Sequence, residues 1–290
     1  MVKSKKKILI TGGYGFLGAS LVERLRNRYK IIIFDKKNNK NLNNLKKFPI
    51  VDIVIHLAAY NSTKDFYKDS FNVIFDNLQP TINLLNFYKK MRKKVLFIYT
   101  GTPEIAVGAV EKYGYKVPTD EKVPYVVSDP LNKRWSYANS KAVGEQMVIC
   151  SGLNYIIIRP HNVYGPSQKN HFIPEFIEKI RKRKIELKGW KNKRSWLYID
   201  DFVDAFEKVL NNKSCLNQII NIGSNYEHSV LKVAKIILKE FKINKKIHKM
   251  KAPEGSALRR VPNIQKIKKL TGWYPKINIH EGIKLLCQKI

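Results

Sequence analysis

Short runs of consecutive apolar residues recur along the chain, and longer stretches with apolar residues at helical spacing separate them. The runs are continuous rather than alternating, which is typical of strands buried on both faces of a parallel sheet. This alternation of strands and helices indicates an α/β fold with a doubly wound parallel sheet, whose ligand crevice lies at the carboxyl ends of the strands. The runs predict strands at residues 7–11, 30–35, 53–57, 95–99, 155–159 and 218–222, and the longer stretches predict helices at residues 17–27, 72–90, 137–151, 174–181, 201–211 and 229–241.

The stretch from Thr11 to Gly18 reads T-G-G-Y-G-F-L-G and joins the first predicted strand to the first predicted helix. Glycines let the backbone turn tightly and approach a pyrophosphate closely, and free N–H groups at the start of a helix attract its charge. The glycines fit two registers, one from Gly12 and one from Gly13, and both end on Gly18. This strand–turn–helix context predicts a Rossmann-type dinucleotide site.

The second predicted strand ends on Asp35, about 20 positions after the glycines, where a carboxylate can accept a hydrogen bond from the adenosine ribose. A carboxylate repels a 2′-phosphate, so Asp35 favours NAD over NADP. Lys36 and Lys37 weaken this inference, because they could neutralise such a phosphate. The Asn- and Lys-rich residues 36–47 predict a loop.

Tyr137 and Lys141 form a Y-x-x-x-K pattern within a predicted helix. Residues four apart lie on one face of a helix, so both side chains can enter one cleft. A free tyrosine, with a pKa of about 10, is a poor base at neutral pH, and a nearby ammonium lowers that pKa. We therefore expect Tyr137 to take a proton from a sugar hydroxyl.

The net charge is +32, which invites a nucleic-acid interpretation. However, the lysines are spread along the chain and occur with abundant Asn and Ile, as AT-rich codon usage would produce. We therefore expect neither a nucleic-acid nor a membrane partner, although the charge would steer an anionic nucleotide toward the protein.

The remaining composition points to a cytoplasmic protein without a metal. No apolar run approaches the ~20 residues of a membrane span. The start of the chain lacks the apolar core of a secretory signal. The three cysteines and six histidines are scattered without metal-ligand spacing, so we expect no metal site.

Taken together, these motifs resemble the extended short-chain dehydrogenase/reductase family, and more narrowly its NAD-dependent nucleotide-sugar epimerases, dehydratases and decarboxylases. The resemblance extends over nearly the whole chain. Beyond the glycine stretch, Asp35 and the Y-x-x-x-K pair, it includes His56-Leu57-Ala58-Ala59, Arg159-Pro160-His161-Asn162-Val163-Tyr164-Gly165-Pro166, Arg194-Ser195-Trp196-Leu197-Tyr198-Ile199-Asp200-Asp201, Arg259-Arg260-Val261-Pro262-Asn263 and Leu270-Thr271-Gly272-Trp273.

The resemblance implies roles for individual residues. It places Thr102 and Glu104 beside Tyr137 and Lys141 in catalysis, and it implies a homodimer that pairs the helices at 72–90 and 137–151. The cofactor contacts it implies are Gly12, Gly15, Phe16, Leu17, Asp35, Leu57, Ala58, Ala59, Tyr137, Lys141 and Pro160, and the contacts to the nucleotide-diphosphate sugar are Asn162, Arg194 and Arg260.

The residues after Thr102 bear on the reaction. In the 4,6-dehydratases an Asp-Glu pair follows this threonine, whereas here Pro103 and Glu104 follow it, and proline cannot act as an acid. Glu104 matches the glutamate of dehydratases and of UDP-glucuronate decarboxylases. We expect a transient 4-keto sugar and epimerisation first, decarboxylation second, and dehydratase or reductase activity as a further alternative. A non-catalytic NAD- or nucleic-acid-binding protein is the alternative from another class.

After Arg159 the pattern loosens, and elements become shorter. We therefore expect residues 1–160 to form the NAD-binding domain, with 218–222 returning to its sheet, and residues 161–290 to form a smaller substrate-binding lobe. Relatives usually carry a further strand between the positions of Asp35 and Val51, which ends in an acidic residue near adenine. The short segment here predicts that this strand is missing or truncated.

Overall fold

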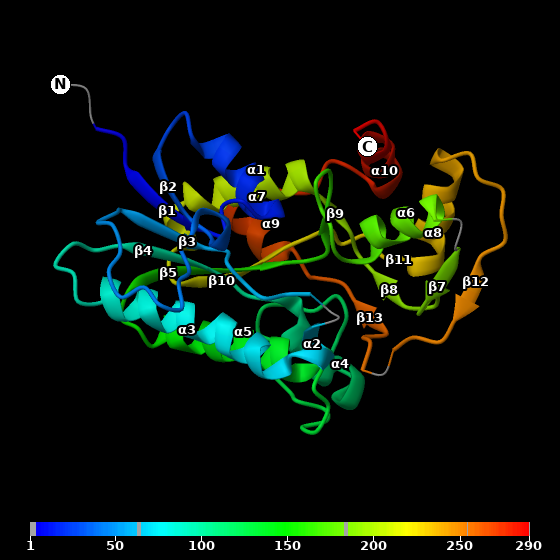
Figure 1. The fold of residues 1–290 in the computed structure, drawn as a ribbon, viewed down its shortest axis with the longest axis horizontal. Helices are drawn as coiled ribbons and strands as arrows, with labels where there is room; N and C mark the ends of the chain where they lie inside the picture. The colour runs from blue at the N-terminus through cyan, green and yellow to red at the C-terminus, as the bar shows by residue number, and fades with distance from the viewer. Residues whose placement is uncertain (1–3, 63–64, 183–184, 254, 290) are drawn as a thin grey trace. The chain divides into compact units, whose positions relative to one another are not determined.

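Six apolar segments pair into one sheet in the computed structural model, which describes residues 4–62, 65–182, 185–253 and 255–289. The strand order is β10-β5-β4-β3-β1-β2 (Figure 1), so the predicted doubly wound α/β fold is confirmed. Each predicted strand is present, with small differences at its ends. The strands are β1 (Lys7–Thr11), β2 (Lys30–Phe34), β3 (Ile53–His56), β4 (Leu96–Thr100), β5 (Asn154–Pro160) and β10 (Gln218–Ile222).

The register of the parallel strands brings their carboxyl ends to one edge. Thr11 at the end of β1 lies opposite His56 at the end of β3, and His56 lies opposite Tyr99 near the end of β4. The segments that follow these strands therefore emerge next to each other, where an open α/β sheet binds its ligand. This alignment positions the glycine stretch, the loop after His56 and Thr102 at the same edge.

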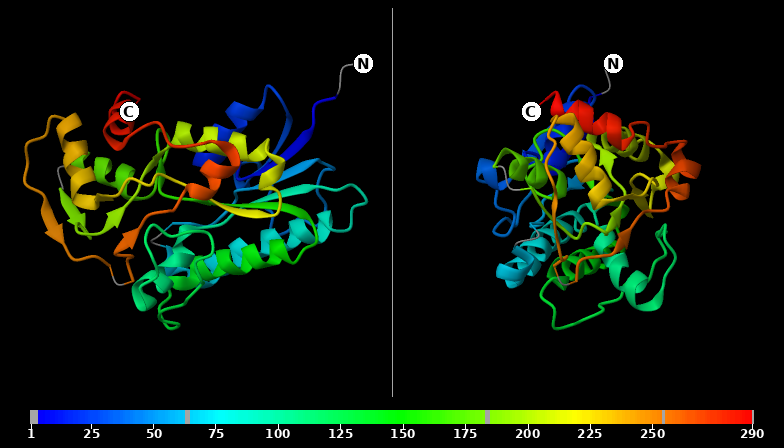
Figure 2. Two further views of the ribbon diagram at one scale, coloured as in Figure 1. Left: turned by 180° about the vertical axis from the view of Figure 1, so that it is seen from behind. Right: turned by 90° about the vertical axis from the view of Figure 1, so that its right-hand side faces the viewer.

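Helices cover both faces of this sheet. Figures 1 and 2 show α3 (Ser70–Tyr88) and α5 (Trp135–Ile149) packed along one face and α1 (Phe16–Leu25) on the other. Their apolar residues join those of the strands in a core that includes Leu9, Leu84 and Phe97. The amphipathic patterns thus predicted these helices correctly, with differences of a few residues at their ends.

The segment between β2 and β3 packs as a loop against α3. Among the described residues from Asp35 to Asp52 there is a 3-10 turn at Lys36–Asn38 and no strand, so β2 is the edge of the sheet. Leu42 and Phe48 are buried in the core, and Asn83 of α3 donates to the Leu42 carbonyl (2.8 Å). The loop therefore takes its place from side-chain packing rather than from a ladder of backbone hydrogen bonds.

The chain divides into two compact units. The first contains nearly all of the large sheet and consists of Met1–Ile105, Asp129–Arg159 and Val209–Ile220, and the second consists of Ala106–Ser128, Pro160–Lys208 and Asn221–Ile290. In the second unit, β8 (Lys193–Arg194) lies between β11 (His228–Ser229) and β13 (Arg259–Arg260). Strands this short carry too few residues for a periodic pattern, so the sequence did not predict them.

Further short strands form two separate pairs, namely β6 (Val163–Tyr164) with β9 (Leu197–Tyr198) and β7 (Glu186–Lys188) with β12 (His248–Met250). The predicted helices at 174–181, 201–211 and 229–241 are present as α6 (Phe172–Arg181), α7 (Ile199–Leu210) and α8 (Val230–Glu240). Four further helices were not predicted from the sequence, namely α2 (Asp65–Lys68), α4 (Val107–Tyr113), α9 (Gln265–Thr271) and α10 (Ile279–Cys287).

Candidate functional site

The glycine stretch forms a tight turn between β1 and α1. Gly12 has a φ of +70°, a conformation that favours glycine, and a Cβ there would lie 2.8 Å from the Ala58 nitrogen. A Cβ on Gly18 would overlap the carbonyl oxygen of Gly12. Side chains at these positions would therefore push apart the turn, the helix and the end of β3.

The start of α1 is free to receive an anion. Gly15 occupies the N-cap position without a side-chain hydrogen bond, and Phe16 and Leu17 begin the helix. The first N–H groups of a helix have no partners inside the helix, and they carry a partial positive charge. A cradle that glycines keep open, next to such a helix start, fits the diphosphate of a dinucleotide.

Asp35 connects the end of β2 to this turn. Its carboxylate accepts hydrogen bonds from the backbone N–H groups of Tyr14 (3.1 Å) and Lys37 (3.0 Å), one on each oxygen. Each oxygen retains a lone pair for a ribose hydroxyl. Lys36 forms an ion pair with Asp76 (2.9 Å), and the Lys37 ammonium donates to the Tyr14 carbonyl (3.1 Å). This donor and acceptor set fits the ribose end of NAD.

His56 joins β1, β3 and α3 through a buried chain of hydrogen bonds. The Thr81 hydroxyl donates to the carbonyl of Asn77 (3.0 Å), so His56 Nε2 must donate to Thr81 (3.0 Å). His56 Nδ1 then accepts from the Thr11 hydroxyl (2.7 Å), which in turn accepts from the Ala58 N–H (3.3 Å).

Burial lowers the pKa of His56 to about 3, with the nearby Lys141 charge acting in the same direction, so the ring is neutral. The hydrogen-bond chain fixes the Leu57-Ala58-Ala59 stretch next to Gly12, since Ala58 is bonded to Thr11 and lies against the glycine.

Tyr137 and Thr102 come together at the carboxyl edge of the sheet. Burial raises the pKa of Tyr137 to about 12, and a hydrogen bond with the Thr102 side chain opposes that rise. The expected net lowering of this pKa is therefore wrong for the chain alone, because removing the phenolate from water outweighs the stabilising groups. Phe66 of α2 stacks on the Tyr137 ring, with centroids 4.9 Å apart, and holds its orientation.

Lys141 lies about one helical turn after this tyrosine and is buried, and its ammonium lies 4.2 Å from the centre of the Tyr99 ring. Burial lowers the pKa of Lys141 to about 7, while the Glu145 charge raises it. An aromatic face favours a cation, so Tyr99 also supports the charged form. Gly144 makes room for this ring, because a Cβ there would overlap the Tyr99 hydroxyl.

A buried ion pair supports the same region. Arg159 of β5 binds Glu145 of α5 through two hydrogen bonds, Nε to Oε1 (3.0 Å) and Nη2 to Oε2 (2.6 Å). Both side chains are only 6% exposed. Gly101 lies against the carboxylate, and a Cβ there would overlap Glu145 Oε1. The pair thus fixes α5 against the segment that carries Thr102.

Glu104 pairs with Arg134, which lies at the start of α5. Arg134 Nη2 lies 3.1 Å from Glu104 Oε2, and both side chains are largely buried. The backbone N–H of Glu104 also donates to Thr102 Oγ1 (3.3 Å), which sets the turn that begins at Thr102. The Glu104 carboxylate is thus held by a permanent cation.

The predicted substrate residues of the second unit also lie together. β8 and β13 are parallel neighbours, and their register places Arg194 opposite Arg260. Arg260 donates to Asn162 Oδ1 (2.7 Å), and Asn162 donates to the Ser195 carbonyl (2.7 Å). Burial lowers the pKa of Arg260 to about 10, which leaves it charged at neutral pH.

Arg194 donates to the carbonyl groups of Lys193 (2.8 Å) and Ala257, so backbone contacts fix its guanidinium. Asn162 has a φ of +41°, in the left-handed region that asparagine adopts more readily than most residues. Two fixed guanidinium groups on neighbouring strands form a site suited to a diphosphate.

The structure therefore places the predicted site residues in two groups, one in each unit. The first unit brings together Gly12, Gly15, Phe16, Leu17, Asp35, Leu57, Ala58, Ala59, Thr102, Glu104, Tyr137 and Lys141, and the second contains Pro160, Asn162, Arg194 and Arg260.

Several neighbours of these residues were not named from the sequence. Glu145 lies four residues after Lys141 and Arg134 three residues before Tyr137, so helical spacing could have indicated both. The roles of Tyr99 and Phe66 could not be predicted from spacing, because their partners are distant in sequence. Each lies in a segment whose sequence is typical of an ordinary core strand or short helix.

No cluster of His, Cys, Asp and Glu able to hold a metal occurs among the residues that the structure describes. Within those same residues, no helix is long and apolar enough to cross a membrane. The cytoplasmic location stays a prediction.

Comparison with known proteins identifies the relatives of this chain. The model of the NAD dependent epimerase/dehydratase family matches residues 8–223. The chain is 32% identical over 311 residues to a Methanocaldococcus jannaschii protein named "Putative UDP-glucose 4-epimerase", covering 96% of each. It is 30% identical over 320 residues to the UDP-N-acetyl-alpha-D-glucosaminuronate decarboxylase of Bacillus cytotoxicus, covering 97% of this chain and 96% of the relative.

Among solved structures, the dTDP-glucose 4,6-dehydratase of Bacillus anthracis, solved in complex with NAD, has a TM-score of 0.79 and 26% identity, covering 98% of this chain and 96% of the relative. The relatives thus include proteins named for three different reactions.

The contact between Lys141 and Tyr99 predicts a measurable shift. Replacing Tyr99 by Leu removes the aromatic face, so the charged form of Lys141 loses about 0.5–2 kcal/mol. We expect the pKa of Lys141 to fall by about one unit below its value near 7. NMR titration of protein labelled at the lysine ε-carbons would follow it, since a resonance that titrates near 7 and is missing in Lys141→Met identifies this side chain.

Tyr99→Phe is the matched control, because it keeps the ring and loses only the hydroxyl. Its Lys141 resonance should titrate close to the wild-type value. Equal pKa values in Tyr99→Leu and in the unmodified protein would contradict the role assigned to the ring.

Proposed function

Because the chain belongs to the NAD-dependent epimerase/dehydratase family, and is thus an enzyme of the extended short-chain dehydrogenase/reductase type, we propose that it epimerises a nucleotide-diphosphate sugar at C4. Membership in a family of enzymes disfavours the non-catalytic alternative. The observation that carries the proposal is the cluster of Thr102, Tyr137 and Lys141 at the carboxyl edge of the sheet.

The cluster can move one proton in both directions. Tyr137 Oη would accept the proton of the sugar 4-hydroxyl, and it would return that proton to the same oxygen when the epimer forms. Thr102 would hydrogen-bond the reacting hydroxyl, since it already contacts Tyr137. The Lys141 ammonium would favour the phenolate, and Phe66 would keep the ring from turning away.

The residues of the glycine turn fit NAD. Bound NAD would supply a hydride acceptor beside the sugar carbon and, in its oxidised form, a positive charge that favours the phenolate. Gly12 and Gly15 would allow the diphosphate to approach the start of α1, and Asp35 would accept from the ribose hydroxyls. Lys36 is engaged with Asp76, which removes one of the two cations that could have received a 2′-phosphate.

Two features disfavour elimination of water. Pro103 occupies the position where an acid would follow Thr102, and Glu104 pairs with Arg134. A carboxylate whose oxygen is bound by a guanidinium is engaged by that partner, so it is poorly placed to act as the acid on the sugar. Return of the hydride to C4 needs no acid at position 103 or 104. These residues therefore support epimerisation.

The second unit would bind the phosphates of the sugar nucleotide. Arg194 and Arg260 supply the charges, and Asn162 fixes the Arg260 guanidinium. The Methanocaldococcus jannaschii relative, which is named for UDP-glucose and aligns over 96% of each chain, supports a UDP-hexose as substrate.

Decarboxylation of a uronic acid is the second candidate. It is supported by Glu104, which decarboxylases share by resemblance, and by the 30% identity to the Bacillus cytotoxicus decarboxylase. Both reactions begin with oxidation at C4, so the same Tyr137 and Lys141 would serve either. A uronate would release carbon dioxide, whereas a neutral hexose cannot, and this difference separates the two.

Replacing Tyr137 by Phe should abolish turnover while leaving cofactor binding intact. Loss of the only proposed proton acceptor is expected to lower kcat by about 10²–10⁴-fold. Kinetics with UDP-glucose and UDP-galactose, together with NAD titration by calorimetry, would measure both properties. Tyr113→Phe is the control, because Tyr113 is 76% exposed and should leave kcat unchanged. Full activity in Tyr137→Phe would overturn the assignment.

We also propose that two copies of the chain pair through α3 and α5. These helices pack side by side, and their outer face exposes Phe71 (75%), Phe75 (43%) and Val143 (47%). The rings of Phe71 and Phe75 stack on each other with centroids 6.3 Å apart. Such an apolar face on two neighbouring helices would be buried by the same face of a second copy.

The double substitution of Phe71 and Phe75 by Glu should convert the dimer to a monomer, because it places charges in the apolar face. Light scattering would then give about 33.8 kDa instead of twice that mass. Leu131→Glu, at a more exposed site (91%) of the same unit, should leave the dimer intact. A wild-type protein that is already monomeric would contradict this proposal.

A further inference from the structure

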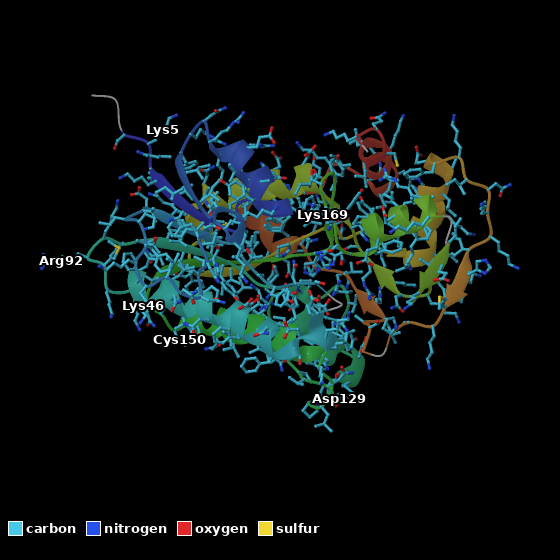
Figure 3. All side chains as sticks on the ribbon, in the orientation of Figure 1. Lys5, Lys46, Arg92, Asp129, Cys150 and Lys169 are labelled. Carbon is cyan, nitrogen blue, oxygen red and sulfur yellow. The ribbon has the colours of Figure 1, made fainter. Side chains whose placement is uncertain are left out.

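The fold concentrates positive charge at the amino edge of the sheet. Six segments lead into the amino ends of the parallel strands, namely residues 4–7, 26–30, 46–52, 89–95, 150–154 and 211–218. They are far apart in sequence, yet the strand pairing places them along one edge of the first unit. Figure 3 labels Lys5, Lys46 and Arg92 near this end of the sheet.

These segments are here called the basic edge, and almost all of their charged residues are cationic. All six segments lie within the described parts of the chain, and Asp52 is their single acidic residue. Lys93 neutralises it in an ion pair of 2.7 Å. All the basic side chains are exposed: Lys5, Lys6, Lys7, Arg26, Arg28, Lys30, Lys46, Lys47, Lys89, Lys90, Arg92, Lys93, Lys94 and Lys213.

The opposite edge of the same unit has no such excess. The segments that leave the carboxyl ends of β1 to β4 carry Lys36 and Lys37 against Asp35 and Glu104, within residues 12–15, 35–38, 57–62 and 101–105. The asymmetry therefore arises from the fold, and it does not follow from a lysine-rich composition alone. Lysines that are dispersed along the sequence thus lie together at one edge of the first unit.

We propose that the basic edge docks the protein on the surface of an anionic lipid bilayer. Lysines next to a membrane are attracted by its negative surface potential, and their long side chains reach its headgroups. Ile50 is 60% exposed among these lysines, and Leu216 is 36% exposed on a neighbouring segment. Apolar side chains within a basic surface suit the boundary between headgroups and acyl chains.

The same surface is less suited to nucleic acid. Single strands are bound through exposed aromatic side chains on which bases stack. The aromatic residues of the basic edge are Tyr29, which hydrogen-bonds Asn211 (3.1 Å), and Phe48, which is buried. Phosphate contacts would remain, but aliphatic Ile50 in the centre of the surface favours lipid.

Docking in this orientation would leave the catalytic edge free. A five-residue strand such as β1 spans about 17 Å, so this distance separates the two edges of the sheet. The glycine turn, Thr102 and Tyr137 would face away from the bilayer and remain open to their ligands.

Vesicle sedimentation tests the proposal. The probe is vesicles of phosphatidylcholine with 30% phosphatidylglycerol, and the reference is vesicles of pure phosphatidylcholine. Both are used at about 0.1 M salt, where charges act over about 10 Å. The wild-type protein should bind the anionic vesicles at least tenfold more tightly, and salt at about 0.5 M should release it. The triple variant Lys46→Glu, Lys90→Glu, Lys94→Glu should lose at least tenfold in affinity and keep its NAD binding.

The matched control changes the same charge elsewhere. Lys232, Lys235 and Lys239 lie on the exposed face of α8, and their replacement by Glu should change binding less than threefold. Ile50→Ser should weaken vesicle binding but not binding to a 20-nucleotide RNA. Equal losses in both triple variants, or tighter binding to RNA than to anionic vesicles, would overturn the proposal, and neither result depends on which sugar the enzyme uses.

Discussion

The parallel register of the central sheet is the constraint on which the rest of the first unit depends. It sets Thr11, His56 and Tyr99 opposite one another, and every segment that follows them emerges at one edge. The backbone hydrogen bonds of the sheet therefore bring the glycine turn, the loop after His56 and Thr102 to one edge. The side-chain contact between Thr102 and Tyr137 joins α5 to them. The same register brings six segments to the other edge, and five of them carry lysine or arginine.

Within that frame, the buried Lys141 determines how the catalytic edge is built. An ammonium removed from water is costly unless its surroundings stabilise the charge. The Tyr99 ring lies 4.2 Å from it, and the Glu145 charge raises its pKa, while burial has the larger, opposite effect. The result is a pKa near 7, so the group is close to the point where its charge can change.

The surrounding residues show why this arrangement stays in place. Glu145 cannot approach Lys141 freely, since Arg159 holds both of its oxygens. His56 contributes no charge, because its hydrogen-bond chain and burial keep it neutral. Small residues at 101 and 144 leave space for Glu145 and for Tyr99. Thus the local electrostatics of the tyrosine–lysine pair depend on how the residues around Glu145 and Tyr99 pack.

Much of this could be predicted from the sequence. Continuous apolar runs indicated all six strands, because strands buried on both faces leave a strong pattern, and the glycine turn and the Tyr137–Lys141 spacing are local signals. Contacts between distant segments left no such trace. Tyr99 under Lys141 and Arg159 on Glu145 therefore emerged only with the fold, as did the raised pKa of Tyr137, whose cause is burial.

The sequence was least informative about where the charges lie in space. Lysines that are dispersed along the chain converge on one edge, because six separate segments end there. A net charge of +32 alone therefore said little about partners. The position of the basic residues, opposite the catalytic edge, says more about partners than the net charge does.

The most direct test of the proposed reaction follows the hydrogen at C4. The enzyme would be incubated with NAD and with a panel of UDP- and dTDP-hexoses deuterated at C4, and the products read by NMR. The account predicts that one member of the panel yields its C4 epimer with deuterium retained at C4, because the same hydride leaves and returns. Deuterium at C6 of a 6-deoxy product, or a panel in which no hexose is epimerised, would contradict it.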